Sequence, residues 1–285
     1  MTEFYDIHCH FLPGIDDGCQ SAEESERYLD EQWKQGCRGI IATPHYYATE
    51  SIASFAERRK HAFEVLAEQL AASGKEEYLK HMGLASEVAY YDGMTSDGDL
   101  EKLFYGSSRY MLLEMPFSEW RPNVLRDVQM LCARGIIPVI AHMERFTDIA
   151  TKDQLQQLMN MPVIIQINAG NFLRHGADKR FAVKLLKNGA MQAIGSDAHN
   201  LTSRSPNVGP ALKVMEDAGY EREMLGVLSV NRKIYEAAAG ASAPQKADGP
   251  GGLKPKNIPD SMMDSRTERG KSRPDIDEAF LKFRF

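Results

Sequence analysis

The chain has 285 residues, of which 43% are hydrophobic and 26% charged, and its formal net charge is −6. This composition is typical of one large or two small globular domains and excludes a wholly disordered chain. The acidic balance disfavours nucleic acid as a partner, because nonspecific affinity for phosphate backbones comes from clustered Lys and Arg.

Seven short apolar runs are typical of parallel strands buried on both faces. They cover residues 4–8, 39–43, 82–87, 110–114, 136–141, 163–168 and 191–196. Helical patterns lie between or after them, at residues 22–35, 55–72, 124–133, 152–159 and 179–187. Ser21 directly precedes the first predicted helix, and Glu24 follows three residues later, which is the spacing of a capping box. The alternation predicts an α/β fold with a parallel sheet, most simply a closed barrel.

The composition changes near Gly240, since five of the chain's 13 prolines lie in residues 240–285. Such a segment cannot bury enough apolar surface to offset the entropy lost on ordering. We therefore expect a folded domain over residues 1–239 and a disordered tail over residues 240–285.

The apolar runs are too short to cross a membrane. The longest, such as residues 135–141 and 162–167, fall well short of the roughly 20 residues that a bilayer span needs. Residues 1–6 lack the basic start and apolar core of a signal peptide. The four cysteines show neither zinc-ribbon spacing nor a disulfide framework. We therefore expect a cytoplasmic protein without membrane insertion.

Six of the seven runs end in histidine, glutamate or aspartate, at the strand ends where α/β barrels carry function. These residues are His8, His10, His45, Glu87, Glu114, His142, Asp197 and His199. Any one of these histidines, taken alone, is expected to be a structural residue, because one hydrogen bond to the backbone satisfies a neutral imidazole ring. So many acids and imidazoles on one rim, however, need a cation to hold them together. The set therefore predicts a site for a borderline divalent metal such as zinc, manganese or iron.

Two arginines follow these strand ends, Arg145 three residues after His142 and Arg204 five residues after His199. The guanidinium fork suits phosphate oxygens, although a salt bridge to a nearby carboxylate is the alternative. Metal ligands beside arginines indicate phosphoryl transfer to water.

Cysteine phosphatase chemistry requires an arginine six residues after the nucleophile. The residues six positions after the four cysteines are Ile15, Ser25, Thr43 and Pro138. The chain also lacks the Gly-x-Ser-x-Gly, Walker and Gly-x-Gly-x-x-Gly motifs. A covalent cysteine mechanism is therefore disfavoured.

In combination, six motifs resemble the polymerase and histidinol phosphatase (PHP) superfamily. More narrowly, they resemble bacterial tyrosine-protein phosphatases encoded with capsule and exopolysaccharide genes. The motifs are Asp6–His10, Leu12–Gly18, Ala42–His45, Ala141–Arg145, Gln166–Gly170 and Gly195–His199. The resemblance runs from about Tyr5 to about Ala239, and it implies a distorted (β/α)7 barrel with three metal ions. Manganese is common in this family, and iron or zinc stay open.

The resemblance also implies a ligand set for each metal. The first set is His8, His10, Glu87 and Asp197; the second is Glu87, Glu114 and His142; the third is Asp17, His45 and His199. Asp17 is preferred to Asp16 because it directly precedes Gly18. Arg145 and Arg204 match the family's phosphate-binding arginines.

The implied activity is hydrolysis of phosphotyrosine by metal-activated water. The implied partner is a membrane-associated tyrosine autokinase that controls polysaccharide export. Three alternatives stay open: a small-molecule phosphatase of the histidinol-phosphate type, a phosphodiesterase, and a regulatory protein whose metal site is structural.

Overall fold

Parallel strands form a curled sheet in the computed structural model, which describes residues 2–239. The strands are β1 (Phe4–Cys9), β2 (Cys37–Ala42), β3 (His45–Tyr46), β4 (Met82–Leu84), β5 (Glu87–Ala89), β6 (Tyr110–Glu114), β7 (Ile137–Ile140), β8 (Ile164–Asn168) and β9 (Ala193–Gly195). They pair in the orders β1-β2-β4 and β3-β5-β6-β7-β8-β9, and every pair is parallel. All seven predicted runs are strands, and the third run is split into β4 and β5.

The first strand meets the segment that follows the last strand. Cys9 forms a parallel bridge with Ala198, and the amide of Asp197 donates to the carbonyl of His8 at 2.8 Å. This contact joins the edge of the three-stranded sheet to that of the six-stranded sheet. The α/β class and the parallel strands predicted from the sequence are thereby confirmed, as a curled, barrel-like sheet. Because all strands run the same way, their carboxyl ends lie on one rim.

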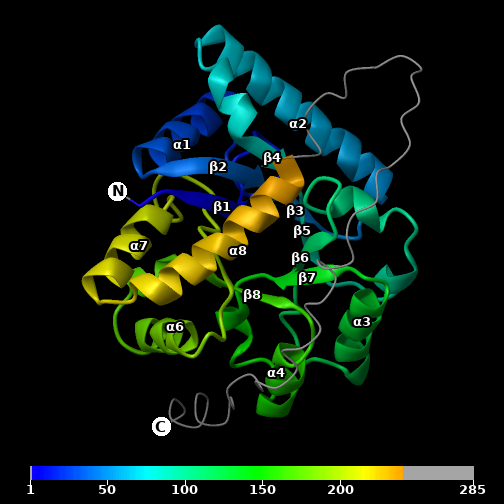
Figure 1. Cartoon of the computed structure of the whole chain (residues 1–285). Coiled ribbons are helices and arrows are strands. Elements are labelled where there is room, and N and C mark those ends of the chain that lie inside the picture. Colours follow the sequence, from blue (N-terminus) through cyan, green and yellow to red (C-terminus); the bar gives the residue numbers. More distant parts are fainter. Residues whose placement is uncertain (1, 240–285) are drawn as a thin grey trace, which may run out of the picture.

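Helices surround this sheet (Figure 1). Five lie where the sequence predicts them: α1 (Ala22–Lys34), α2 (Ile52–Ala72), α3 (Pro122–Ala133), α4 (Lys152–Met159) and α6 (Ala177–Lys187). The sequence analysis did not assign α5 (Gly170–Leu173), α7 (Val208–Asp217) or α8 (Glu221–Ala239). Short 3-10 turns lie at η1 (Glu76–His81), η2 (Met94–Ser96), η3 (Leu100–Leu103) and η4 (Met143–Phe146).

The cap of α1 differs slightly from the predicted capping box. The Ser21 hydroxyl accepts a hydrogen bond from the Glu24 amide at 3.2 Å, as expected. The Glu24 carboxylate, however, accepts from the amide of Gln20 at 2.9 Å instead of returning to Ser21. A reciprocal box does form at α4, between Thr151 and Gln154.

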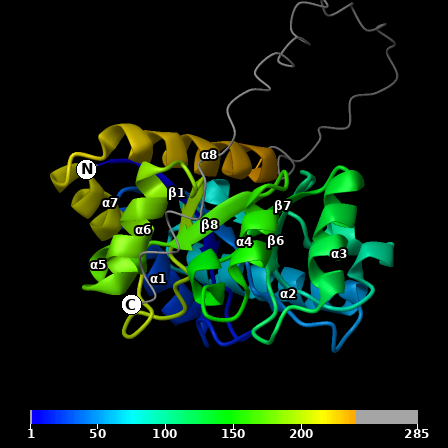
Figure 2. The ribbon, with the colours of Figure 1, turned by 90° about the horizontal axis from the view of Figure 1, so that it is seen from below.

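The last described helix, α8, lies across the strands (Figure 1), and Figure 2 shows it along one edge of the molecule. Its Asn231 side chain bonds to the backbone of both Tyr5 and Ile194, so it fastens β1 to β9. Ile234, Tyr235 and Ala238 of α8 join a buried cluster with residues of the strands such as Ile7 and Val139. The helix thus helps to fill the space enclosed by the curled sheet.

Within residues 2–239, no helix combines the length and the apolar character that a membrane crossing requires. The expected tail over residues 240–285 lies outside the described residues.

Candidate metal centre

The structure brings all nine predicted metal ligands together. Seven lie at or after the carboxyl end of a strand, whereas His45 and Glu87, which the sequence placed at strand ends, begin the short strands β3 and β5. Three overlapping groups have ligand atoms within 4.8 Å of one another: His8, His10, Glu87 and Asp197; His10, Asp17, His45 and His199; and His45, Glu87 and Glu114. The ninth residue, His142, places its Nε2 atom 3.3 Å from Oε1 of Glu114. The first group contains the same four residues as the first set implied by the family resemblance.

Glu87 lies at the middle of this arrangement, fully buried at the start of β5. Its Oε2 atom is 3.1 Å from Nε2 of His8, 3.2 Å from Nε2 of His10 and 3.1 Å from Nδ1 of His45. Its Oε1 atom is 2.7 Å from Nε2 of His142. One carboxylate therefore faces four imidazoles.

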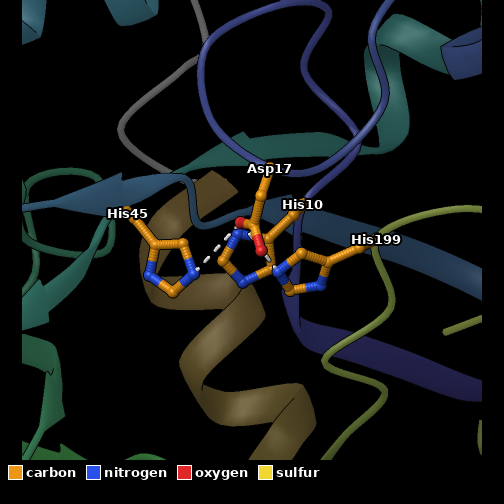
Figure 3. A group of neighbouring side chains, drawn as sticks. All are labelled: His10, Asp17, His45 and His199. Carbon is orange, nitrogen blue, oxygen red and sulfur yellow. Dashed lines mark ion pairs between the residues drawn. The ribbon is translucent and has the colours of Figure 1, made fainter.

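Asp17 stands over a group of three histidine rings (Figure 3). Its Oδ1 atom is 3.4 Å from Nε2 of His45 and 3.2 Å from Nε2 of His199. Its side chain is 61% exposed, unlike the buried Glu87 and Asp197. This group therefore lies at the solvent-facing edge of the site.

Several buried atoms of these side chains have no hydrogen-bond partner. They are Nε2 of His8, Nε2 of His10, Nδ1 of His45, Oε2 of Glu87, Nδ1 of His142 and Nε2 of His199. A buried polar atom without a partner is costly and rare in folded proteins. Five nitrogens and one carboxylate oxygen left in this way are the donor set that a borderline divalent ion prefers. The residues present therefore fit a bound metal.

Asp16 forms hydrogen bonds that orient two of the predicted ligands, His10 and His45. Asp16 accepts from Nδ1 of His10 at 2.8 Å and from the amide of His45 at 3.0 Å. Burial by itself would lower the pKa of His10, but the neighbouring carboxylates of Asp16 and Glu87 raise it to about 10. Asp16 thus supports a ligand, while Asp17 faces the site.

Two amide side chains, those of Gln166 and Asn168, also form hydrogen bonds that orient predicted ligands. Gln166 Oε1 lies 3.0 Å from Nδ1 of His8 and accepts from the amide of His142 at 2.8 Å. Asn168 donates to Oδ2 of Asp197 at 2.8 Å. Partners of this kind fix the orientation of metal ligands. The sequence analysis did not assign them, although both lie on the same face of β8 by the two-residue alternation of a strand.

Two of the nine predicted ligands have unusual backbone conformations. His142 (φ 28°) and Asp197 (φ 50°) are the only non-glycine residues with positive φ in the part of the chain that the structure describes. This region disfavours side chains and typically costs on the order of 1–3 kcal/mol per residue. Such conformations cluster at functional sites, where surrounding contacts impose them.

Gly195 permits the approach of β9 to β1 next to the site. A Cβ atom at this position would lie 2.6 Å from Cβ of His8, which is too close for any side chain. The glycine therefore keeps His8 within reach of Asp197, whose Oδ1 is 3.6 Å from its Nε2.

Both predicted arginines contact Asp197. Arg145, in η4, pairs with Oδ2, and Arg204 donates to Oδ1 at 2.8 Å. Burial would raise the pKa of Asp197, but nearby positive groups including His8 and Arg145 hold it below its usual range. The salt bridge considered from the sequence is therefore present, and its partner is itself a predicted metal ligand.

A cavity of about 390 Å³ adjoins these pairs, and its lining includes Arg145, Asn168, Asp197 and Arg204. The side chain of each arginine is about one third exposed. A bound anion beside the metal centre could therefore contact both arginines.

Comparison with known proteins gives a consistent result. Residues 4–234 match the family described as capsular polysaccharide synthesis, CpsB/CapC. Tyrosine-protein phosphatase YwqE of Bacillus subtilis (strain 168) is 31% identical over 222 residues, which cover 74% of this chain and 83% of that protein. Tyrosine-protein phosphatase CpsB of Streptococcus pneumoniae is 31% identical over 235 residues, which cover 74% and 88%.

A solved structure is similar as well. It belongs to the crystal structures of YwqE from Bacillus subtilis and CpsB from Streptococcus pneumoniae, described as unique metal-dependent tyrosine phosphatases. The TM-score is 0.70 at 26% identity, and the match covers 82% of this chain and 94% of the other.

Proposed function

Since the chain belongs to the capsular polysaccharide synthesis family CpsB/CapC, we propose that its strand-end residues hold three divalent ions, with manganese as the first candidate. The protein is a metal-dependent tyrosine-protein phosphatase of this family. The proposed ligand sets are His8, His10, Glu87 and Asp197; Glu87, Glu114 and His142; and Asp17, His45 and His199. The proposed phosphatase domain is residues 1–239.

The observation that carries the proposal is the group of partnerless buried atoms around Glu87. When bound, divalent ions there supply Lewis acidity, which lowers the pKa of water from about 15.7 toward 7 and neutralises charge on phosphoryl oxygens. Gln166, Asn168 and Asp16 keep the ligand side chains in their orientations. The rigid strand ends therefore hold the reacting centre before substrate arrives.

Arg145 and Arg204 are proposed to hold the phosphoryl oxygens. Asp197 pairs with both guanidinium groups, so it aligns them on the same side of the site. Departure of tyrosinate, with a pKa near 10, needs less protonation than departure of a serine alkoxide. The site therefore supports aryl phosphate hydrolysis without a dedicated strong acid.

No cysteine is needed in this mechanism. Cys9, between two proposed ligands, is fully buried, and burial raises the pKa of its thiol well above the usual range. Burial likewise raises the pKa of the Cys19 thiol to about 12. A neutral, buried thiol is a poor nucleophile.

The substrate proposed for the cell is a phosphotyrosine-bearing protein, and specifically a bacterial tyrosine autokinase. The free thiols of all four cysteines support a reducing, cytoplasmic location for this reaction.

The test of the function is turnover by purified protein whose metal content is measured. We expect hydrolysis of a phosphotyrosine peptide at a kcat/KM well above those for the matching phosphoserine peptide and for histidinol phosphate. A preference for histidinol phosphate would contradict the tyrosine phosphatase assignment. No turnover of any phosphoester by metal-loaded protein would favour a regulatory role.

Replacing Arg145 or Arg204 by alanine should lower kcat/KM for a phosphotyrosine peptide without emptying the metal site. A hydrogen bond to a charged group contributes about 1.5–3 kcal/mol, so the expected loss is roughly 10- to 200-fold. Arg→Lys should recover only part, because an ammonium group cannot make the two-pronged contact.

The measurement is steady-state kinetics paired with metal analysis for each variant. Arg232→Ala is a matched control, because Arg232 is an exposed arginine on α8 that pairs with Glu236. Wild-type kinetics in both the Arg145 and Arg204 variants would show that neither arginine binds phosphate.

A further inference from the structure

Two exposed aromatic side chains lie directly against ligands of the metal centre. Tyr47 is 51% exposed and Phe117 is 55% exposed. The Tyr47 ring stacks on His45 with centroids 5.3 Å apart and planes 24° apart. The Phe117 ring lies against His142 with centroids 6.1 Å apart and planes 32° apart. Each ring is thus exposed and at the same time in contact with a proposed metal ligand.

The chain directions explain both positions. Tyr47 follows His45 by two residues at the end of β3, so the two side chains leave the strand on the same face. Phe117 comes three residues after Glu114, where β6 ends. It rests on the buried ring of Phe146, with centroids 5.1 Å apart, and Phe146 packs in turn against Trp120. Phe117 therefore has a firm apolar backing.

Tyr47 and Phe117 pack on His45 and His142, two proposed ligands that both contact the carboxylate of Glu87. His45 contacts Oε2 of Glu87 and His142 contacts Oε1. Tyr47 also forms part of the wall of a cavity of about 390 Å³, together with Ile15, His45 and Asp17. This cavity is large enough for an aromatic ring.

We propose that Tyr47 and Phe117 bind the phenyl ring of a phosphotyrosyl residue and so select aryl over alkyl phosphates. The inference rests on the proposed function, since it names the groups that recognise the substrate of that site. The phosphate and metal contacts are the same for phosphotyrosine and phosphoserine, so they cannot distinguish the two. Contact with an aromatic ring can, because phosphoserine has none.

The test compares two non-hydrolysable ligands, benzylphosphonate and methylphosphonate, which share the phosphonate and differ by the ring. Binding to the manganese-loaded protein is measured by calorimetry for the wild type, Tyr47→Ala, Phe117→Ala and the double variant. We expect wild type to prefer benzylphosphonate. Each alanine variant should weaken benzylphosphonate binding roughly two- to tenfold, by the usual contribution of an aromatic pair, and change methylphosphonate binding less than twofold.

Three further variants separate recognition from support of the metal site. Tyr47→Phe and Phe117→Tyr keep the rings and should keep the preference for benzylphosphonate. Leu225→Ala removes an equally exposed apolar side chain on α8 and should leave both ligands unaffected. Metal content, measured for every variant, should stay at the wild-type level.

Equal weakening of both ligands, or no preference in the wild type, would overturn the proposal. So would an unchanged preference in the double variant. If an alanine variant loses metal, Phe117→Leu and Tyr47→Leu give the same comparison with the apolar volume kept. Failure of the proposed function itself would appear separately, as wild-type protein that does not hydrolyse a phosphotyrosine peptide.

Discussion

Extended chelation should reduce phosphatase activity by on the order of 10³-fold or more, because Lewis acidity contributes several kcal/mol to lowering the barrier. Addition of manganese should restore it. The loss should be accompanied by a lower melting temperature, since metal binds the folded chain and brings the buried carboxylates and imidazoles together. The measurements are phosphotyrosine peptide turnover, elemental analysis and thermal unfolding on the same samples.

Magnesium provides the matched control for reloading. It prefers oxygen ligands and keeps much of its water, whereas this centre offers five histidines beside its carboxylates. Magnesium should therefore restore activity poorly. Full activity in protein shown to contain no metal would contradict both the metal requirement and the proposed ligand sets.

Replacing Glu87 by glutamine should have the largest effect of any single substitution. The change keeps the shape of the side chain but removes the charge of the carboxylate that contacts all four of His8, His10, His45 and His142. Removing one partner of a buried charged group typically costs about 3–5 kcal/mol. We therefore expect a lower melting temperature. We also expect the metal content to fall and kcat/KM to fall with it, on the order of 10²-fold or more, because turnover depends on the Lewis acidity of the metal.

Asp127→Asn is the control for loss of a buried carboxylate elsewhere. Asp127 lies on α3, belongs to none of the three groups of candidate ligands, and accepts from the hydroxyl of Tyr90 at 2.6 Å. This variant should keep its metal and its turnover of phosphotyrosine. If Glu87→Gln instead retained a full metal complement and wild-type kinetics, Glu87 would not be the shared ligand.

The strand-end ligands could be predicted because parallel strands place their carboxyl ends on one rim. His8 and Asp197 are far apart in sequence, yet each follows an apolar run that reads as a buried strand. The structure turns Asp17 toward His45 and His199, whereas Asp16 contacts Nδ1 of His10. Metal binding by each of these residues stays a prediction until metal content is measured.

The supporting residues could not be predicted in the same way. Asp16 contacts Nδ1 of His10 only because the turn after β1 brings the two side chains together. Gln166 contacts His8 and His142 only because β1 and β7 end beside β8 in the folded sheet. The aromatic pair escaped notice for a related reason. The exposure and the ring stacking of Tyr47 and Phe117 depend on the conformations of the loops after β3 and β6. Hydrophobic periodicity in the sequence does not predict loop conformation. Helices α7 and α8 were missed because no strand follows them to mark the alternation.

The contacts between β1 and β9 can form only after most of the chain has been synthesised. The amide of Ser196 donates to Asp6, a contact between residues 190 positions apart, and Asn231 then fastens both strands from α8. A growing chain carries seven of the nine proposed ligands before Asp197 and His199 emerge from the ribosome. Until then β1 keeps an open edge that can pair with other chains. The centre on which catalysis depends is thus finished among the last parts of the fold.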